Sequence, residues 1–168
     1  MIYSTHHSKR SSTHCNRFVV KGVLCAFIFF VLFPIPSARA NCVFTSLAGV
    51  NFGNYDVFSS LPNNNGVGSI TVNCRGGTSS FEMLLSSGVS NSFTTRTLMS
   101  GSQVLNYNLY TNIARTVVWG DGTGGSVTLS GLSNGKTTIN VFGQIYAGQN
   151  AKVGIYSDTI VVTVRALI

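Results

Sequence analysis

Few side chains in this sequence are suited to chemistry. Its 168 residues include three histidines, all within the first 14 positions, and only four carboxylates. Histidine is the commonest general acid–base residue and a common metal ligand, so a domain without it has few routes to catalysis. We therefore predict that the chain is not an enzyme, with no catalytic residue, no cofactor and no metal.

Two carboxylates are candidate site residues. Asp121 lies in the glycine-rich run Gly120–Gly125 and could supply one ligand to Ca²⁺. A calcium site needs several oxygen ligands at defined spacing, so a turn role is favoured for Asp121. Asp158 is predicted on the apolar face of the last strand, where a buried carboxylate needs a partner. Arg96 and Arg115 are its candidate partners.

One tryptophan lies beside that glycine-rich run. The aromatic residues in general fall within predicted strands, where core packing is the usual role. Trp119 is the candidate for an exposed platform that stacks on carbohydrate, and the core is its alternative position. Trp119 and Asp121 together form the predicted surface-contact loop.

Four cysteines divide into two pairs. Cys15 and Cys25 precede position 40, and Cys42 and Cys74 follow it. In an exported chain the second pair is most simply a disulfide, whereas a reactive thiol pair lacks the expected Cys-x-x-Cys spacing. Closing a loop of about 30 residues would stabilise the fold by roughly 3 to 4 kcal/mol.

The first 40 residues have the order of a secretory signal peptide. Basic residues precede an apolar run from Val23 to Phe33, and a small-x-small cleavage site ends at Ala40. The apolar run is shorter than the ~20 residues of a membrane-spanning helix, so we predict no stable membrane anchor. We expect a cleaved signal at residues 1–40 and one exported domain at residues 41–168.

The basic charge of the whole chain is concentrated in this leading segment. The formal net charge is +7, but residues 41–168 hold six basic and four acidic side chains, or 6 − 4 = +2. A nucleic-acid partner is therefore not expected for the exported domain.

Residues 41–168 show no sustained helical periodicity. Short runs of alternating apolar and polar residues recur between glycine- and asparagine-rich stretches. We expect Arg75–Thr78 to turn the chain, Ser87–Gly101 to contain a long loop with Arg96 in it, and Asn134-Gly135 to form a hairpin. Short, regularly spaced strands with an inter-strand cysteine pair predict an all-β, immunoglobulin-like β-sandwich.

The last apolar stretch raises a question about strand pairing. Ile160, Val162 and Val164 alternate with mostly polar residues, which predicts a strand with one buried face. A strand this apolar normally has neighbours on both sides. Either an earlier strand covers its free flank, or another chain does.

Six short segments together resemble the spore coat protein U domain family, which includes the pilins of archaic chaperone-usher pili. Each segment is weak alone, but their order and spacing match the family across the exported domain. The segments are Phe52–Asp56, Gly68–Cys74, Leu105–Tyr110, Trp119–Gly122, Val141–Ile145 and Gly154–Thr159.

This resemblance implies an immunoglobulin-like sandwich that lacks its last strand. In such pilins a periplasmic chaperone lends the strand, and a neighbouring subunit later replaces it, which is a form of β-strand addition. The resemblance therefore implies that Ile160, Val162 and Val164 border a partner-strand groove. The implied partners are a periplasmic pilus chaperone, an outer-membrane usher and other pilin subunits.

The implied role is that of an exported fimbrial subunit in adhesion or biofilm formation, first in the periplasm and then at the cell surface. Shaft subunits of the family carry a donor segment before the first cysteine, whereas cleavage after Ala40 leaves only Asn41. We therefore expect a tip position, or the first domain of a two-domain adhesin. The competing hypotheses are a coat or matrix protein assembled without an usher, and a sugar- or metal-binding module with a concave site.

Overall fold

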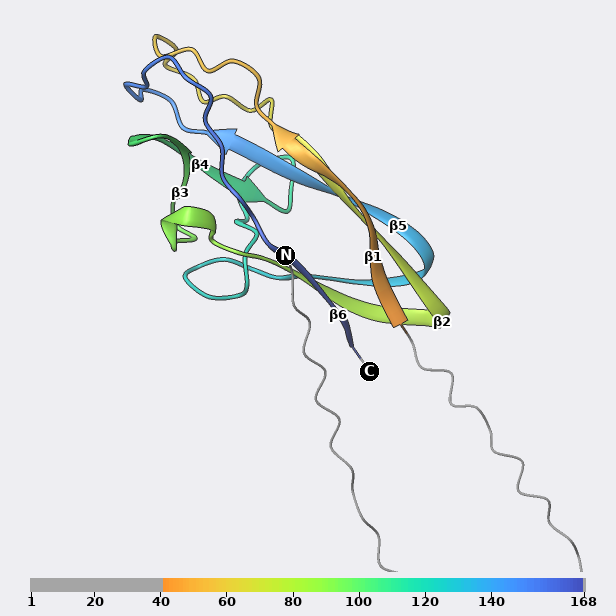
Figure 1. Ribbon diagram of the computed structural model, residues 1–168. Helices are drawn as coiled ribbons and strands as arrows, with labels where there is room; N and C mark the ends of the chain where they lie inside the picture. The colour runs from red at the N-terminus through yellow and green to blue at the C-terminus, as the bar shows by residue number, and fades with distance from the viewer. Residues whose placement is uncertain (1–40, 168) are drawn as a thin grey trace, which may run out of the picture. The chain divides into compact units, whose positions relative to one another are not determined.

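The domain is built from β-strands (Figure 1). The computed structural model describes residues 41–167, which form one compact unit. The all-β prediction is confirmed, and the predicted signal peptide lies outside the described residues. No helix in residues 41–167 has the length and apolarity to cross a bilayer. The elements are β1 (Asn41–Asn51), β2 (Val67–Leu85), the 3-10 helix η1 (Gly88–Ser90), β3 (Arg96–Ser100), β4 (Gln103–Tyr110), β5 (Leu129–Ile145) and β6 (Val162–Leu167).

The long strands β2 and β5 organise the sheet. All pairings are antiparallel in the order β1-β2-β5-β4-β3, and β6 also pairs with β2. The part of β2 up to Arg75 pairs with β1, and the part from Ser80 pairs with β6, while β5 lies along the other edge of both parts. β1 and β6 therefore follow one another along the same edge of β2. The curled sheet encloses the core as an immunoglobulin-like sandwich.

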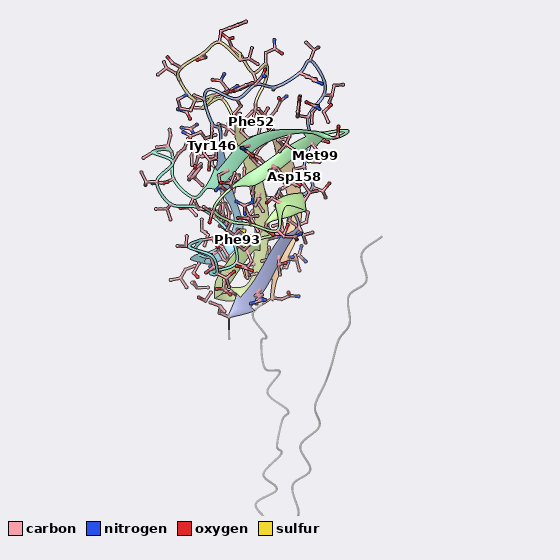
Figure 2. All side chains as sticks on the ribbon, turned by 90° about the vertical axis from the view of Figure 1, so that its left-hand side faces the viewer. Phe52, Phe93, Met99, Tyr146 and Asp158 are labelled. Carbon is pink, nitrogen blue, oxygen red and sulfur yellow. A yellow bond between two sulfur atoms is a disulfide. The ribbon has the colours of Figure 1, made fainter. Side chains whose placement is uncertain are left out.

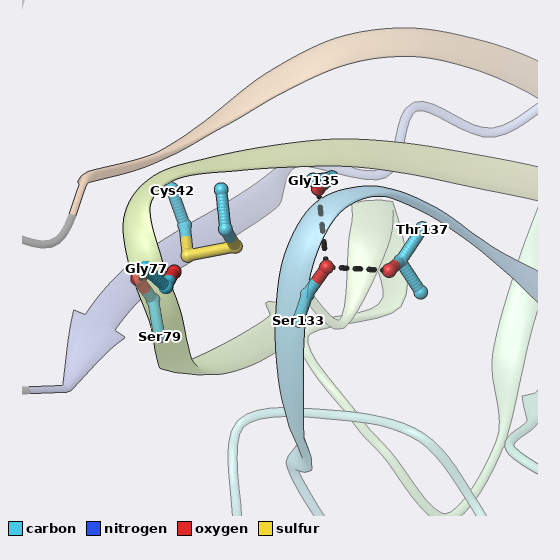
Figure 3. The surroundings of a disulfide bond; sticks show 7 residues. Cys42, Gly77, Ser79, Ser133, Gly135 and Thr137 are labelled. Carbon is cyan, nitrogen blue, oxygen red and sulfur yellow. Dashed lines mark hydrogen bonds between the residues drawn. A yellow bond between two sulfur atoms is a disulfide. The ribbon is translucent and has the colours of Figure 1, made fainter.

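Glycines bend the two long strands at matching positions. Gly76 and Gly77 have φ of 95° and 106°, and the register between β2 and β5 shifts between Cys74 and Ser79. On β5, Gly135 has φ of 118°, and the Ser133 hydroxyl donates a hydrogen bond to its carbonyl (Figure 3). The turn expected at Arg75–Thr78 and the hairpin expected at Asn134-Gly135 are therefore wrong. Positive φ at these glycines lets continuous strands pass around the corner of the sandwich.

Trp119 lies in the core of the domain. Its side chain is 0% exposed, and its indole N–H donates a hydrogen bond to the Met83 carbonyl, with a nitrogen–oxygen distance of 3.2 Å. The surface-contact role predicted for Trp119 is therefore wrong. An indole that is buried with its N–H satisfied packs as a core residue and offers no face to a ligand.

Arg96 is a fully buried cation on β3. Its guanidinium donates hydrogen bonds to the carbonyls of Ser86 and Trp119 and to the Asn108 side-chain oxygen, and it lies over the Phe93 ring. Burial lowers the pKa of Arg96, because the charged form loses its hydration. The segment Ser87–Gly101, which was expected to contain a long loop with Arg96 in it, thus includes strand β3. Arg96 joins the end of β2 to β3, β4 and the turn at Trp119.

A disulfide joins the two strands at the start of the domain. Cys42 on β1 lies directly opposite Cys74 on β2, and their sulfurs are bonded (Figure 3). The predicted pairing is confirmed. The bond fixes β1 to β2 beside the glycine bend, so this end of β1 is held covalently.

Replacing both cysteines by serine is expected to lower the free energy of unfolding by about 3 to 4 kcal/mol, because the unfolded chain loses a loop constraint. Urea denaturation followed by circular dichroism measures the difference. Reduction of the unchanged protein with dithiothreitol should reproduce the loss. An unchanged midpoint for the double variant would contradict this role of the disulfide.

Candidate functional site: an apolar groove between β1 and β6

The apolar residues of β1 are only half covered. Phe44 lies opposite Val72 and Leu47 lies opposite Ile70, so each pair shares the face turned toward the core. The two β2 residues are fully buried, whereas Phe44 and Leu47 are 49% and 54% exposed. A core-facing residue with this exposure has no element packed over it.

Burial also decreases from β2 to its other neighbour along this edge, β6. Val162 and Val164 lie opposite Leu85 and Met83, which are buried, yet both valines remain partly exposed. Ile160 precedes the strand and is also only partly covered while packing on the core. Exposure therefore rises from β2 toward both of its neighbours along one edge, as expected where a strand between β1 and β6 is missing.

A groove of about 1000 Å³ lies at this place. One wall is formed by residues 47–58, which include the end of β1, and the other by residues 151–160 together with Val162. Between the walls the groove reaches the core. Among residues 41–167, β1 and β6 each pair with one neighbour only, β2. Their other edges present backbone N–H and C=O groups that a further strand can pair with. The floor consists of Ile70, Leu98, Leu105, Tyr107, Leu109, Val141 and Ile145.

The segment before β6 is held in place by β3, β4 and η1. The backbones of Ser157 and Met99 exchange two hydrogen bonds of 2.8 and 3.0 Å. The Asp158 carboxylate accepts hydrogen bonds from the Tyr107 hydroxyl at 2.7 Å and from the Val89 amide at 3.0 Å. Figure 2 shows Asp158 near Met99 of β3. Burial and this hydrogen bond raise the pKa of Tyr107. Arg96 and Arg115, the candidate partners of Asp158, bond to other acceptors instead.

Gly88 makes room for this carboxylate. Its φ is +69°, and a Cβ added there would lie 2.0 Å from an Asp158 carboxylate oxygen. Substitution of Gly88 by alanine is therefore expected to cost about 2 to 4 kcal/mol, from backbone strain and displacement of Asp158. Gly101 is a matched control, because its φ is +58° and nothing lies near its missing Cβ. Thermal unfolding of the two variants should differ, and equal melting temperatures would refute the role of Asp158.

The remaining acidic candidate is satisfied by its own loop. Asp121 is exposed and accepts hydrogen bonds from the amide and the hydroxyl of Thr123, which lower its pKa. Within residues 41–167 no group of three or more histidine, cysteine, aspartate or glutamate side chains is placed to hold a metal ion. The structure thus assigns Asp121 a turn role and leaves its contact role a prediction.

Two short strings in β5 look like catalytic motifs but lie in the wrong context. Residues 131–135 read Gly-Leu-Ser-Asn-Gly, and residues 135–137 read Gly-Lys-Thr. A nucleophile elbow and a phosphate-binding loop both need a strand that turns into a helix. Here all of these residues belong to the continuous strand β5, and the Ser133 hydroxyl bonds to Gly135 and Thr137 (Figure 3). We assign them no chemistry.

Residue patterns missed one wall of the groove. Phe44 and Leu47 are three residues apart, which breaks the two-residue alternation of a regular strand. The structure explains the spacing by a register shift between Phe44 and Ser46. Such a bulge brings both side chains to one face of the sheet. The number of apolar residues in Asn41–Asn51 was the one sequence signal that could have indicated a second apolar wall.

The fold and the groove together define a class, an immunoglobulin-like sandwich that is open along one edge. The chain belongs to the Spore Coat Protein U domain family, whose model matches residues 29–163.

Two individual proteins show further similarity. Protein U of Myxococcus xanthus is 32% identical over 65 residues, which is 39% of this chain and 36% of that protein. A chain of the CsuC–CsuE chaperone–tip adhesion subunit complex from archaic Csu pili of Acinetobacter baumannii matches in structure. Its TM-score is 0.54 at 20% identity, over 75% of this chain and 39% of that one. The chain thus spans less than half of each, and the second likeness shows the fold alone.

Proposed function

We propose that this protein is a structural subunit of a chaperone-usher fimbria, and that a β-strand from another chain completes its fold. The supporting observation is the loss of burial from β2 to β1 and β6, with the groove between them open to the core. Family membership and the fold of the Csu complex support the same proposal.

The free energy available from filling the groove is large. Covering three or so aliphatic side chains is worth roughly 5 to 8 kcal/mol. An entire domain is stable by only about 5 to 15 kcal/mol. Ile160 and Val162 on one wall and Leu47 on the other would gain most of this cover. A subunit that lacks this contribution depends on a partner for its stability.

The proposed partners act in sequence. A periplasmic chaperone supplies the strand first, and a neighbouring pilin replaces it at an outer-membrane usher by β-strand addition. The protein would then leave the periplasm and become part of a surface fimbria that serves adhesion or biofilm formation. In this scheme the domain binds and positions, and no catalysis is proposed.

Periplasmic expression tests this proposal. The chain is produced with and without a cognate periplasmic pilus chaperone, and soluble protein is quantified. We expect abundant soluble protein only with the chaperone, as a one-to-one complex. A stable, soluble monomer in similar amounts without the chaperone would refute the proposal. N-terminal sequencing of the exported protein tests the tip position, because that prediction requires a mature chain that starts at Asn41.

A coat or matrix protein that assembles without an usher is the second candidate. The name of the family, which refers to a spore coat, supports this candidate. This role requires the occupying strand to come from another copy or another coat protein. Self-assembly of the purified protein without an usher would support it, and a strict need for the usher would exclude it.

A further inference from the structure

The two walls of the groove continue beyond the strands without interruption. Every residue from 47 to 58 lines the groove, although β1 ends at Asn51, and every residue from 151 to 160 does so, although β6 begins at Val162. Both extensions are loops at the same end of the domain (Figure 1). The groove is therefore longer than the strand edges that border it.

Large apolar side chains stand at this extended end. Phe58, Val153 and Ile155 are 94%, 108% and 91% exposed, the three highest values among the large apolar residues described. All three line the groove. Leu61 and Ile113 are also exposed but do not line it. Exposed apolar side chains that line one end of the same groove indicate a contact surface.

The two loops are held by specific hydrogen bonds. The Tyr55 hydroxyl donates to the Tyr146 carbonyl at 3.0 Å and accepts from the Gln149 amide at 2.9 Å, which links the two loops. The Asp56 side chain accepts from the Phe58 amide at 2.9 Å. The exposure of Phe58 is therefore a feature of a bonded loop, and its side chain is presented next to the opening.

We propose that these loops form a clamp for the end of the incoming strand, with Phe58 on one side and Val153 and Ile155 on the other. This inference rests on the proposed function and extends it, because it makes the occupant longer than β6 and apolar at its far end. The occupant is an extended segment, since the groove leads directly from two free strand edges into the clamp. At about 3.3 Å per residue, each further pair of residues adds one inward side chain.

Peptide binding tests the clamp. The probes are designed peptides of alternating valine and threonine. One has six residues, the length of β6. A second is extended by about four residues at its N-terminus, and a third by about four residues at its C-terminus. Binding to the purified protein is measured by fluorescence anisotropy. We expect one extended peptide to bind at least about tenfold more tightly than the short one.

The variant F58S/V153S/I155S is expected to lose this tenfold gain while it keeps its affinity for the short peptide. L61S is the matched control, because Leu61 is exposed on the neighbouring stretch of loop but lies outside the groove, and it should retain the gain. If the triple variant keeps the tenfold gain in affinity, the clamp is refuted. The clamp is refuted as well if the variant adheres less to an apolar surface but binds the extended peptide as tightly as the unchanged protein does. If no peptide binds the unchanged protein, the proposed function fails as well.

Discussion

A chain that carries its own completing strand is expected to be more stable than the original by about 5 to 8 kcal/mol, because the strand covers the partly exposed apolar side chains of β1 and β6. The strand, of alternating valine and threonine, is fused after Ile168 through a short turn. It can then run antiparallel to β6, as in a hairpin. Urea denaturation with the disulfide intact gives the free energies of unfolding.

The control for this experiment replaces each inward valine of the added strand by serine. The hydrogen-bonding groups of the backbone remain, but the apolar cover is lost, so most of the gain should disappear. Equal stability of the fused and the original chain would show that the groove does not accept a strand.

Replacing Arg96 by leucine is expected to cost about 3 to 6 kcal/mol, which rivals the total stability of a domain. Its guanidinium satisfies the carbonyls of Ser86 and Trp119 and one of the hydrogen bonds of the Asn108 side-chain oxygen. Leucine leaves both carbonyls without this donor, and the Asn108 oxygen keeps only the Leu109 amide. Lysine is expected to rescue little, because one ammonium cannot reproduce the planar arrangement of the donors. The yield of soluble protein and the urea midpoint measure the loss.

Arg115 provides the comparison. Its guanidinium also donates to backbone carbonyls, those of Gly143, Ile113 and Asn64, but two of these three bonds lie at the exposed surface. Water can replace it there, so the same substitution at Arg115 should cost about 1 kcal/mol. Similar losses for the two arginines would contradict the role assigned to burial.

The fold class followed from the sequence because alternation and turn residues act locally. The bends at Gly76–Gly77 and Gly135 were misread as reversals, because a glycine with positive φ serves a hairpin and a bend equally well. Only the pairing of β2 with β5 along both halves distinguishes them. Trp119 was misplaced for a similar reason, since a glycine-rich neighbour suggests a surface turn while the ring itself enters the core.

The groove could be predicted on one side only. The alternation of Ile160, Val162 and Val164 pointed to one wall, and Ile160 and Val162, but not Val164, are among the residues that line the groove. The bulge in β1 hid Leu47 on the other wall. The partners of Asp158 were also out of reach of sequence reasoning. A tyrosine hydroxyl and a backbone amide satisfy this carboxylate, and neither leaves a charge pattern in the sequence.

Hydrogen exchange at β1 and β6 tests the central claim most directly. Amides of these strands that point away from β2 should exchange rapidly in the free domain and become protected once a partner strand is bound, because only then do they have acceptors. Slow exchange of those amides in the free monomer would mean that the edges are already paired, and it would contradict the account.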